Sequence, residues 1–458
     1  MSTTVPTEAR LTPRTWGMLF VLCGAIFLEG IDVAMLNVAL PAIRADLGMS
    51  TGQLQWVISA YVLGYGGFML AGGRAADLFG RRRMFLAWLA VFLVVSAAGG
   101  LAGEGWLLIA ARFVAGVAAA VMAPAGLSII TTAFAEGPQR NRALLVYSGT
   151  AAAGFSLGLV LGGLLTAVNW RLVLFVPAVL ALLILVLGAS LIPVTPRERV
   201  TGRRVDLPGA VTVTAAIVLL VLGVERSAHV GAAWTAALVA AGLALGAVFV
   251  RIERRSAAPL VRLGLLRSGT LVRANLAALL FSAAFFGFQF VAVLYLQELR
   301  GWSTGQTSLA MLAIGADAVL APTLTPRLVR RFGNAKVVVT GLVLALVAYV
   351  LFLPIGTDTA YLAMFPTMIV LGVAFALAYG PLTIVATNGV DESEQGLAGG
   401  LLYTSFQFGA ALGLAACTAV LTGAAAGPGS YRMALAVPIA AVALAAVISG
   451  TGLRKRVA

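Results

Sequence analysis

The sequence has few charged residues for its length. Only 10% of its 458 residues are Asp, Glu, Lys or Arg, whereas 61% are hydrophobic and the mean hydropathy is +1.01. Soluble domains are about 45–50% apolar and about 25% charged. A soluble protein this apolar would lack the polar residues that cover a surface. The composition therefore excludes an ordinary soluble domain and indicates an integral membrane protein.

Cysteines and catalytic signatures are also scarce. The two cysteines, Cys23 and Cys417, lie in apolar runs without the spacing of a disulfide or a metal site, so we expect both to act as small hydrophobic residues. The sequence contains no GxxxxGK[ST], HExxH or GxSxG signature, and its polar stretches are shorter than about 20 residues. These absences argue against an ATP-driven pump and against a hydrolase. We expect a protein that is not an enzyme and that uses no cofactor.

The apolar residues fall into fourteen runs. A membrane helix needs about 20 apolar residues to cross roughly 30 Å of hydrocarbon. We therefore predict an all-α integral membrane protein with fourteen transmembrane helices, at residues 16–41, 54–75, 84–103, 107–134, 142–167, 171–192, 207–225, 233–252, 270–297, 304–329, 335–354, 361–388, 396–422 and 432–450.

Basic residues predict the orientation of these helices. With the N-terminus inside, 25 of the 31 Lys and Arg residues lie in cytoplasmic segments and five lie outside, while Arg112 lies within the fourth run. This is the distribution that the positive-inside rule describes. We expect a multi-pass protein of the inner (plasma) membrane with both termini in the cytoplasm. The net charge of +14 does not indicate nucleic-acid binding, because the arginines form short clusters between apolar runs.

Two basic links, 193–206 and 251–268, bracket the seventh and eighth helices. The arginine clusters FGRRR at 79–83 and RLVRRFG at 327–333 follow the second helix of the first and last six-helix blocks. Such repetition is typical of transporters with two related halves and a site between them. We predict a six-helix bundle over 1–192, a linker with two extra helices over 193–268 and a second bundle over 269–458.

The loop GGRAADLFGRRRMFL, residues 72–86, resembles the Gly-x-x-x-Asp-x-x-Gly-Arg-Arg loop of the major facilitator superfamily. The resemblance implies a loop that closes the cytoplasmic side and gates the change between states; an ordinary solvated basic loop is the alternative. Leu78 replaces an arginine that is usual in the family. The matching residues are Gly73, Asp77, Gly80, Arg81 and Arg82.

Further signatures narrow the resemblance to the fourteen-helix drug:proton antiporters of that superfamily. The fourth run resembles an Arg-x-x-x-Gly motif at Arg112 and Gly116, and an interfacial arginine is the alternative. GFSLGLVLGG in the fifth run resembles the antiporter signature, although Leu159 replaces its proline; close helix packing is the alternative. Its glycines are Gly154, Gly158, Gly162 and Gly163.

Three of the 17 acidic residues lie well inside predicted helices, where a charge costs roughly 2.5–3.5 kcal/mol. Glu29 and Asp32 are three residues apart and share a helix face. Burial and a neighbouring carboxylate both favour protonation, so each can exchange a proton that competes with a cationic substrate. We predict proton coupling by Asp32, Glu29 and Arg112; a structural ion pair of Asp32 with Arg112 is the alternative.

Aromatic and amide side chains inside the predicted helices, together with one further acid, predict a substrate site. Aromatic faces suit flat lipophilic cations. Lipid-facing or packing roles are the alternative for each. The candidates are Asp317, Asn37, Gln289, Tyr295, Tyr379, Tyr403 and Gln407.

The leading hypothesis is proton-coupled export of small amphipathic drugs, most of them cationic, by a monomer in the lipid bilayer. The partners we expect are thus the substrate, protons and lipid, with no nucleic acid. A dedicated exporter of one antibiotic, metabolite or lipid is the alternative within transport. A membrane receptor or scaffold that transports nothing is a remote alternative.

Overall fold

The N-terminal half of the chain forms six long helices. The computed structural model describes residues 13–454, apart from 195–205, 227–230, 257–258, 260–263, 265–266, 355, 357–358 and 424–426. The first six helices are α1 (Pro13–Leu47), α2 (Thr51–Phe79), α3 (Arg81–Gly100), α4 (Gly105–Ala133), α5 (Pro138–Val168) and α6 (Leu172–Leu191). Their apolar sequences match the predicted spans, and the turn between α2 and α3 is made by Gly80 at φ +99°.

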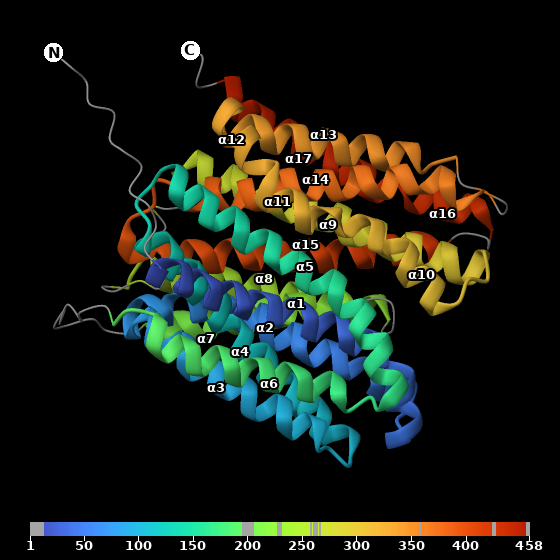
Figure 1. The fold of residues 1–458 in the computed structure, drawn as a ribbon, viewed down its shortest axis with the longest axis horizontal. Helices are drawn as coiled ribbons and strands as arrows, with labels where there is room; N and C mark the ends of the chain where they lie inside the picture. The colour runs from blue at the N-terminus through green and yellow to red at the C-terminus, as the bar shows by residue number, and fades with distance from the viewer. Residues whose placement is uncertain are drawn as a thin grey trace.

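The last six predicted runs form the second half. It contains α9 (Gly269–Leu294), the π-helix η2 (Tyr295–Leu299), α10 (Thr304–Met311), the 3₁₀ helix η3 (Leu312–Ala316), α11 (Asp317–Thr323), α12 (Thr325–Phe332), α13 (Asn334–Leu351), α14 (Tyr361–Thr387), the 3₁₀ turn η4 (Glu392–Glu394), α15 (Gln395–Gly423), α16 (Pro428–Ala434) and α17 (Ala436–Arg454). In Figure 1 most of these helices lie above α1–α4 and α6, while α5 reaches up beside α11 and α14; the helices of both halves run along the long axis.

The tenth predicted span, 304–329, is not the continuous helix that we expected. It is divided into α10, η3, α11 and α12, with a bend of 54° between 305–323 and 325–332. Pro322 and Pro326 explain the break, because proline has no N–H for the helix ladder and clashes with the preceding turn. Pro326 lies in the first turn of α12, where proline is tolerated.

The predicted number of spans is not confirmed. Twelve helices among the described residues are long and apolar enough to cross a membrane, and the bent pair would make thirteen. The apolar part of α7 (Leu207–Arg226) is shorter, at 208–223. The helical membrane class is as predicted, whereas the count of fourteen stays a prediction.

Helices α7 and α8 (Ala232–Glu253) lie outside the N-terminal bundle. α7 packs against α2, where Gly67 leaves room for Val218, and Val213 and Ile217 share a cluster with Leu397 of α15. Hence α7 contacts both halves, while α8 keeps side chains such as Trp234 and Leu243 exposed.

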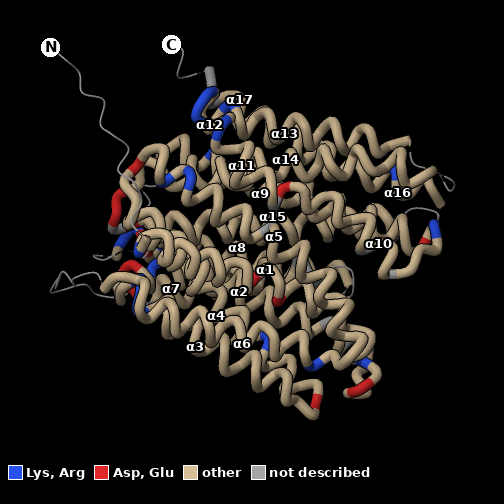
Figure 2. Tube along the Cα trace, viewed as in Figure 1, with Lys and Arg blue, Asp and Glu red and all other residues tan. Residues whose placement is uncertain are grey.

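Charges mark one end of the molecule. Lys and Arg crowd at the end where α1 begins and α17 ends, and few charges occur along the middle of the helices (Figure 2). We call this the arginine-rich end. Because successive long helices alternate in direction, the turns from α2 to α3 and from α4 to α5, with Arg81 and Arg140, lie at the same end as the start of α1. It is the end that the sequence predicts to be cytoplasmic.

Candidate functional site

The buried charges of the N-terminal half include an ion pair between α1 and α4. Arg112 Nη1 donates to Asp32 Oδ2 at 2.8 Å, and the two residues are 2% and 0% exposed. The guanidinium carbon also lies 4.4 Å from the centroid of the Tyr61 ring on α2, a cation–π distance. The structure thus contains the pairing of Asp32 with Arg112 that the sequence left as an alternative.

This ion pair is incompletely satisfied. Asp32 Oδ1 and Arg112 Nε are both buried, and neither has a hydrogen-bond partner in the part of the chain that the structure describes. A buried ion pair offsets its desolvation cost only when its remaining donors and acceptors are also bonded. One contact without supporting hydrogen bonds is therefore a poor stabiliser.

Glu29 lies one turn before Asp32 but has different neighbours. Its Oε2 accepts a hydrogen bond from the hydroxyl of Tyr65 at 3.3 Å, and the residue is 6% exposed. Tyr65 stacks on Tyr61, with ring centroids 5.7 Å apart. Tyr147, Tyr379 and Tyr403, from α5, α14 and α15, lie within electrostatic range of Glu29. Tyr147 and Tyr403 also share a side-chain hydrogen bond, which joins the two halves.

Aromatic rings of α9, α14 and α15 contact one another in the C-terminal half. Tyr379 stacks on Phe375 at 5.0 Å and contacts Phe406 at 4.7 Å, between centroids. Phe375 in turn contacts Phe285 of α9 at 4.5 Å. Of the predicted substrate residues, Tyr379 thus lies in this aromatic cluster, whereas Tyr403 shares a side-chain hydrogen bond with Tyr147 of α5.

The other predicted substrate residues are more dispersed. Asn37 is exposed on α1 and donates to the Val33 carbonyl at 3.0 Å. Gln289 on α9 and Gln407 on α15 are partly buried. Tyr295 is fully buried within the C-terminal half, where its hydroxyl donates to the Gly356 carbonyl at 2.6 Å. Packing explains the position of Tyr295 without a substrate.

Asp317 begins α11, directly after the 3₁₀ turn η3, and is 4% exposed. This segment packs against α5: a Cβ on Gly149 would meet Ala321 at 2.9 Å, and one on Gly315 would meet Ser156 at 2.9 Å. Asp317 is therefore a buried acid at a contact between the halves, at the place where the tenth span is broken.

The glycines of the antiporter signature lie against α1. A Cβ on Gly154 would lie 2.5 Å from the Phe27 carbonyl, one on Gly158 2.7 Å from Ala34 Cβ, and one on Gly162 2.7 Å from Met35 Cα. Gly163 has open space around it. Three of the four predicted glycines therefore bring α5 onto the helix that carries Glu29 and Asp32.

The predicted gating loop joins the two halves at the arginine-rich end. Asp77 Oδ1 and Oδ2 accept hydrogen bonds from the backbone N–H groups of Gly396 and Leu397, at 3.2 and 3.1 Å. These amides begin α15, so the carboxylate occupies the positive end of a helix dipole. Gly73 is close to the same helix, since a Cβ there would lie within 2.3 Å of the Gly396 carbonyl.

Arg81 and Arg82 of the loop donate hydrogen bonds to different partners. Arg81 donates from Nε to Asp77 Oδ1 at 3.2 Å and from Nη2 to the Glu392 carbonyl, which ties it to η4 of the other half. Arg82 donates to the carbonyls of Ile192 and Ala189 at 2.9 and 2.6 Å. Arg81 therefore contacts the opposite half, whereas Arg82 joins α3 to the end of α6.

A second connection between the halves escaped the sequence analysis, which counted Arg140 only as a cytoplasmic charge. Arg140 is 2% exposed and donates from Nη2 to the Thr387 carbonyl and to Gln395 Oε1, both at 3.2 Å. Its Nη1 pairs with Glu136 at 3.2 Å, and Glu136 accepts from the Gly389 amide at 2.8 Å. The spacing of Glu136 and Arg140, one helical turn, was the available signal.

Among the described residues, no group of three or more His, Cys, Asp or Glu side chains could hold a metal ion. The arrangement instead offers buried carboxylates, the buried arginines Arg112 and Arg140, aromatic rings and two connections that hold one end closed. These parts suit the binding and release of protons and small molecules rather than covalent catalysis.

The model of the Major Facilitator Superfamily matches residues 22–414. The chain belongs to this superfamily. It is accordingly a multi-pass membrane transporter and not an enzyme.

Several relatives are named for export or resistance. The transporter is 38% identical to the cephamycin export protein CmcT of Amycolatopsis lactamdurans, over 87% of this chain and 83% of the relative. It is 36% identical to the puromycin resistance protein pur8 of Streptomyces alboniger, over 90% and 83%. It is 32% identical to the multidrug efflux pump LfrA of Mycolicibacterium smegmatis, over 91% and 83%. These relatives agree with the drug:proton antiporter family indicated by the sequence motifs.

A solved structure of the same fold is the human organic anion transporter MFSD10. It has a TM-score of 0.72 at 14% identity, and the match covers 96% of this chain and all of that chain. At this identity the likeness shows the fold alone.

Proposed function

We propose that the transporter exports amphipathic drugs, chiefly cations, in exchange for protons. The observation that carries this proposal is the Asp32–Arg112 pair, which is buried, short and otherwise unsupported by hydrogen bonds. An acid that is costly to bury and is held by a single contact suits a proton-binding role better than a structural one.

The proton acts by competing with Arg112 for the carboxylate. A proton that arrives from outside neutralises Asp32 and weakens its bond to Arg112 Nη1. When the site faces the cytoplasm, the proton leaves, the carboxylate is charged again and the pair re-forms. Each inward proton can thus be exchanged for an outward substrate. A one-for-one exchange of a proton for a monovalent cation moves no net charge, so the pH difference drives it, at about 1.4 kcal/mol per pH unit.

The substrate is held between the halves by Glu29 and the tyrosines around it. The positive charge of the substrate faces the Glu29 carboxylate, which in this structure accepts a hydrogen bond from Tyr65. The flat apolar part of the substrate lies against Tyr379, Tyr403 and Phe406. Cation–π contacts of this kind contribute about 0.5–2 kcal/mol each. Because the tyrosines come from both halves, the site is complete only when these halves are close.

The two connections at the arginine-rich end close the cytoplasmic side. Asp77 and Arg140 hold α15 and the end of α14, so the site opens inward only when both contacts break. In this proposal the bent tenth segment and α7 supply the thirteenth and fourteenth spans. The protein acts as a monomer in the inner (plasma) membrane with both termini in the cytoplasm.

Everted vesicles with an acidified lumen and a pH-reporting dye test the proposal. Addition of lipophilic cations should dissipate the gradient for the wild type and not for Asp32→Asn. Asp46→Asn is a matched control, because Asp46 is on the same helix but is exposed and paired with Arg171. If no cation changes the gradient in wild-type vesicles, the export of cationic drugs is refuted.

A dedicated exporter of one antibiotic is the second candidate. The relatives named for single compounds are 38% and 36% identical, compared with 32% for the multidrug pump LfrA. Vesicles that respond to a single compound among many amphipathic cations and anions would favour this candidate.

A further inference from the structure

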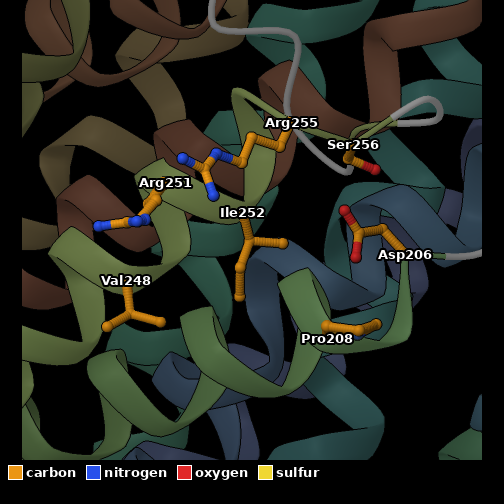
Figure 3. Close-up of a pocket in the computed structure, with 7 residues that line it drawn as sticks. All are labelled: Asp206, Pro208, Val248, Arg251, Ile252, Arg255 and Ser256. Atoms are coloured by element: carbon orange, nitrogen blue, oxygen red, sulfur yellow. The ribbon is translucent and has the colours of Figure 1, made fainter.

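A cavity lies outside the transport site, between the start of α7 and the end of α8. It has a volume of about 400 Å³ and is lined by Asp206, Pro208, Val248, Arg251, Ile252, Arg255 and Ser256. Figure 3 shows the Arg251 and Arg255 guanidiniums on one side of it, the Asp206 carboxylate on the other and Ile252 between them. The cavity therefore offers positive and negative groups a short distance apart.

The two arginines form the positive side. Arg251 lies in the last turn of α8 and Arg255 lies just after the helix, and their guanidiniums lie on the same side of the cavity (Figure 3). Both are exposed, and neither forms an ion pair with another described residue. Two adjacent guanidiniums suit a phosphate, which they can bind through charge-assisted hydrogen bonds.

Asp206 forms the negative side. The residue is 9% exposed, and its Oδ1 accepts a hydrogen bond from the Gly209 amide at 2.8 Å. Its Oδ2 is buried and has no hydrogen-bond partner among the described residues. The buried carboxylate of Glu253 faces the same glycine, Gly209, and so adds to the negative charge on this side. An unpaired buried carboxylate oxygen is costly. A ligand that brings N–H donors to this oxygen would remove that cost.

The surroundings of the cavity suit a lipid. Val248 is 45% exposed, and α8 also exposes Leu243 and Trp234, at 61% and 70%. In a membrane this face contacts acyl chains, while the cavity lies at the arginine-rich end, at the level of the head groups. Basic pockets at the cytoplasmic ends of membrane helices commonly bind lipid head groups.

We propose that this cavity binds a phospholipid whose head group carries both a phosphate and a primary ammonium, as in phosphatidylethanolamine. The phosphate binds Arg251 and Arg255, and the ammonium donates to Asp206 Oδ2. A purely anionic head group would leave this oxygen unpaired and place negative charge near it. A trimethylated head group has no N–H to donate. The inference rests on the membrane position of the family and not on the proposed substrate.

The test measures lipid binding to the purified, delipidated full-length chain by native mass spectrometry. Phosphatidylethanolamine, its N-monomethyl and N,N-dimethyl derivatives, phosphatidylcholine and phosphatidylglycerol would be titrated, all with the same acyl chains. Wild type should bind phosphatidylethanolamine about tenfold more tightly than phosphatidylcholine, the effect of one charge-assisted hydrogen bond. This comparison needs no variant, so it does not depend on the folding of a mutant.

Variants then assign the two sides. Asp206→Asn should lose the preference for phosphatidylethanolamine over phosphatidylcholine, whereas the double variant R251Q/R255Q should bind both about tenfold more weakly. R254Q is the matched control, because Arg254 is exposed on the same turn but does not line the cavity.

Three results would overturn the inference. Equal binding of phosphatidylethanolamine and phosphatidylcholine by wild type would show that no primary ammonium is recognised. Tighter binding of phosphatidylglycerol would show a simple basic patch. Displacement of the lipid by millimolar inorganic phosphate would show a site for free anions.

Discussion

An alanine at Gly158 should impair both the stability and the activity of the transporter. A Cβ at this position would lie 2.7 Å from Ala34 Cβ and 2.9 Å from Ile31 Cα. Both contacts are with α1, and Ile31 directly precedes Asp32. Since Cβ atoms are rarely closer than 3.0 Å to another heavy atom, α5 must move away from α1 by several tenths of an ångström.

The cost follows from overpacking. Extra methyl groups in a well-packed interior typically cost 1–3 kcal/mol, and we expect Gly158→Ala to lose about 2 kcal/mol. For a protein of several hundred residues such a loss lowers Tm by only a few degrees. The displacement of α1 also lengthens the 2.8 Å contact between Asp32 and Arg112, so coupled efflux should fall more than stability does.

The assay compares Gly158→Ala with Gly163→Ala, a matched control on the same helix with no atom within 4 Å of its Cβ position. Unfolding in detergent and drug-induced proton flux in vesicles would be measured for both. Gly163→Ala should behave like wild type in both assays. If the two variants lose equal stability and equal flux, the close contact of α5 with α1 is not what the signature glycines provide.

Further predictions concern the connections and the two carboxylates. Asp77→Asn should weaken the hydrogen bonds to the α15 amides by about 1–2 kcal/mol. Cysteines placed in the proposed substrate site should then react faster with a thiol reagent added from the cytoplasmic side, and an unchanged reaction rate would count against a closing role for Asp77. Arg140→Gln removes a buried donor to Thr387 and should cost about 1–3 kcal/mol, measured by unfolding in detergent, with Arg142→Gln as the control. Asp32→Asn should keep substrate exchange across vesicles without a proton gradient, whereas Glu29→Gln should lose it; the reverse result would exchange their roles.

Hydropathy alone located the helices of this fold. Each of the fourteen apolar runs is helical in the structure, because helices satisfy every backbone polar group within a segment that cannot bond to water. The break at 312–324 was missed, since hydropathy averages over a window and does not register the prolines at 322 and 326.

The site was only partly predictable. Asp32 and Arg112 stood out because charges are rare in membrane helices, and their pairing could be named as an alternative. Tyr65 and Tyr147 did not stand out, since aromatic residues are common in such helices. They come together with Glu29 through the packing of α1, α2 and α5 with α14 and α15, which no local pattern contains.

The two carboxylates of α1 differ most in where their partners come from. Asp32 pairs with Arg112 of the same half, so the residues that surround it stay the same while the halves move apart, whether or not the pair is formed. Glu29 is surrounded by tyrosines of α2, α5, α14 and α15, so its environment changes whenever the halves separate. A group that must keep its proton through the conformational change benefits from a constant environment, whereas a group that must release a substrate benefits from one that comes apart. This difference is the physical reason to give proton binding to Asp32 and the contact with the cation to Glu29.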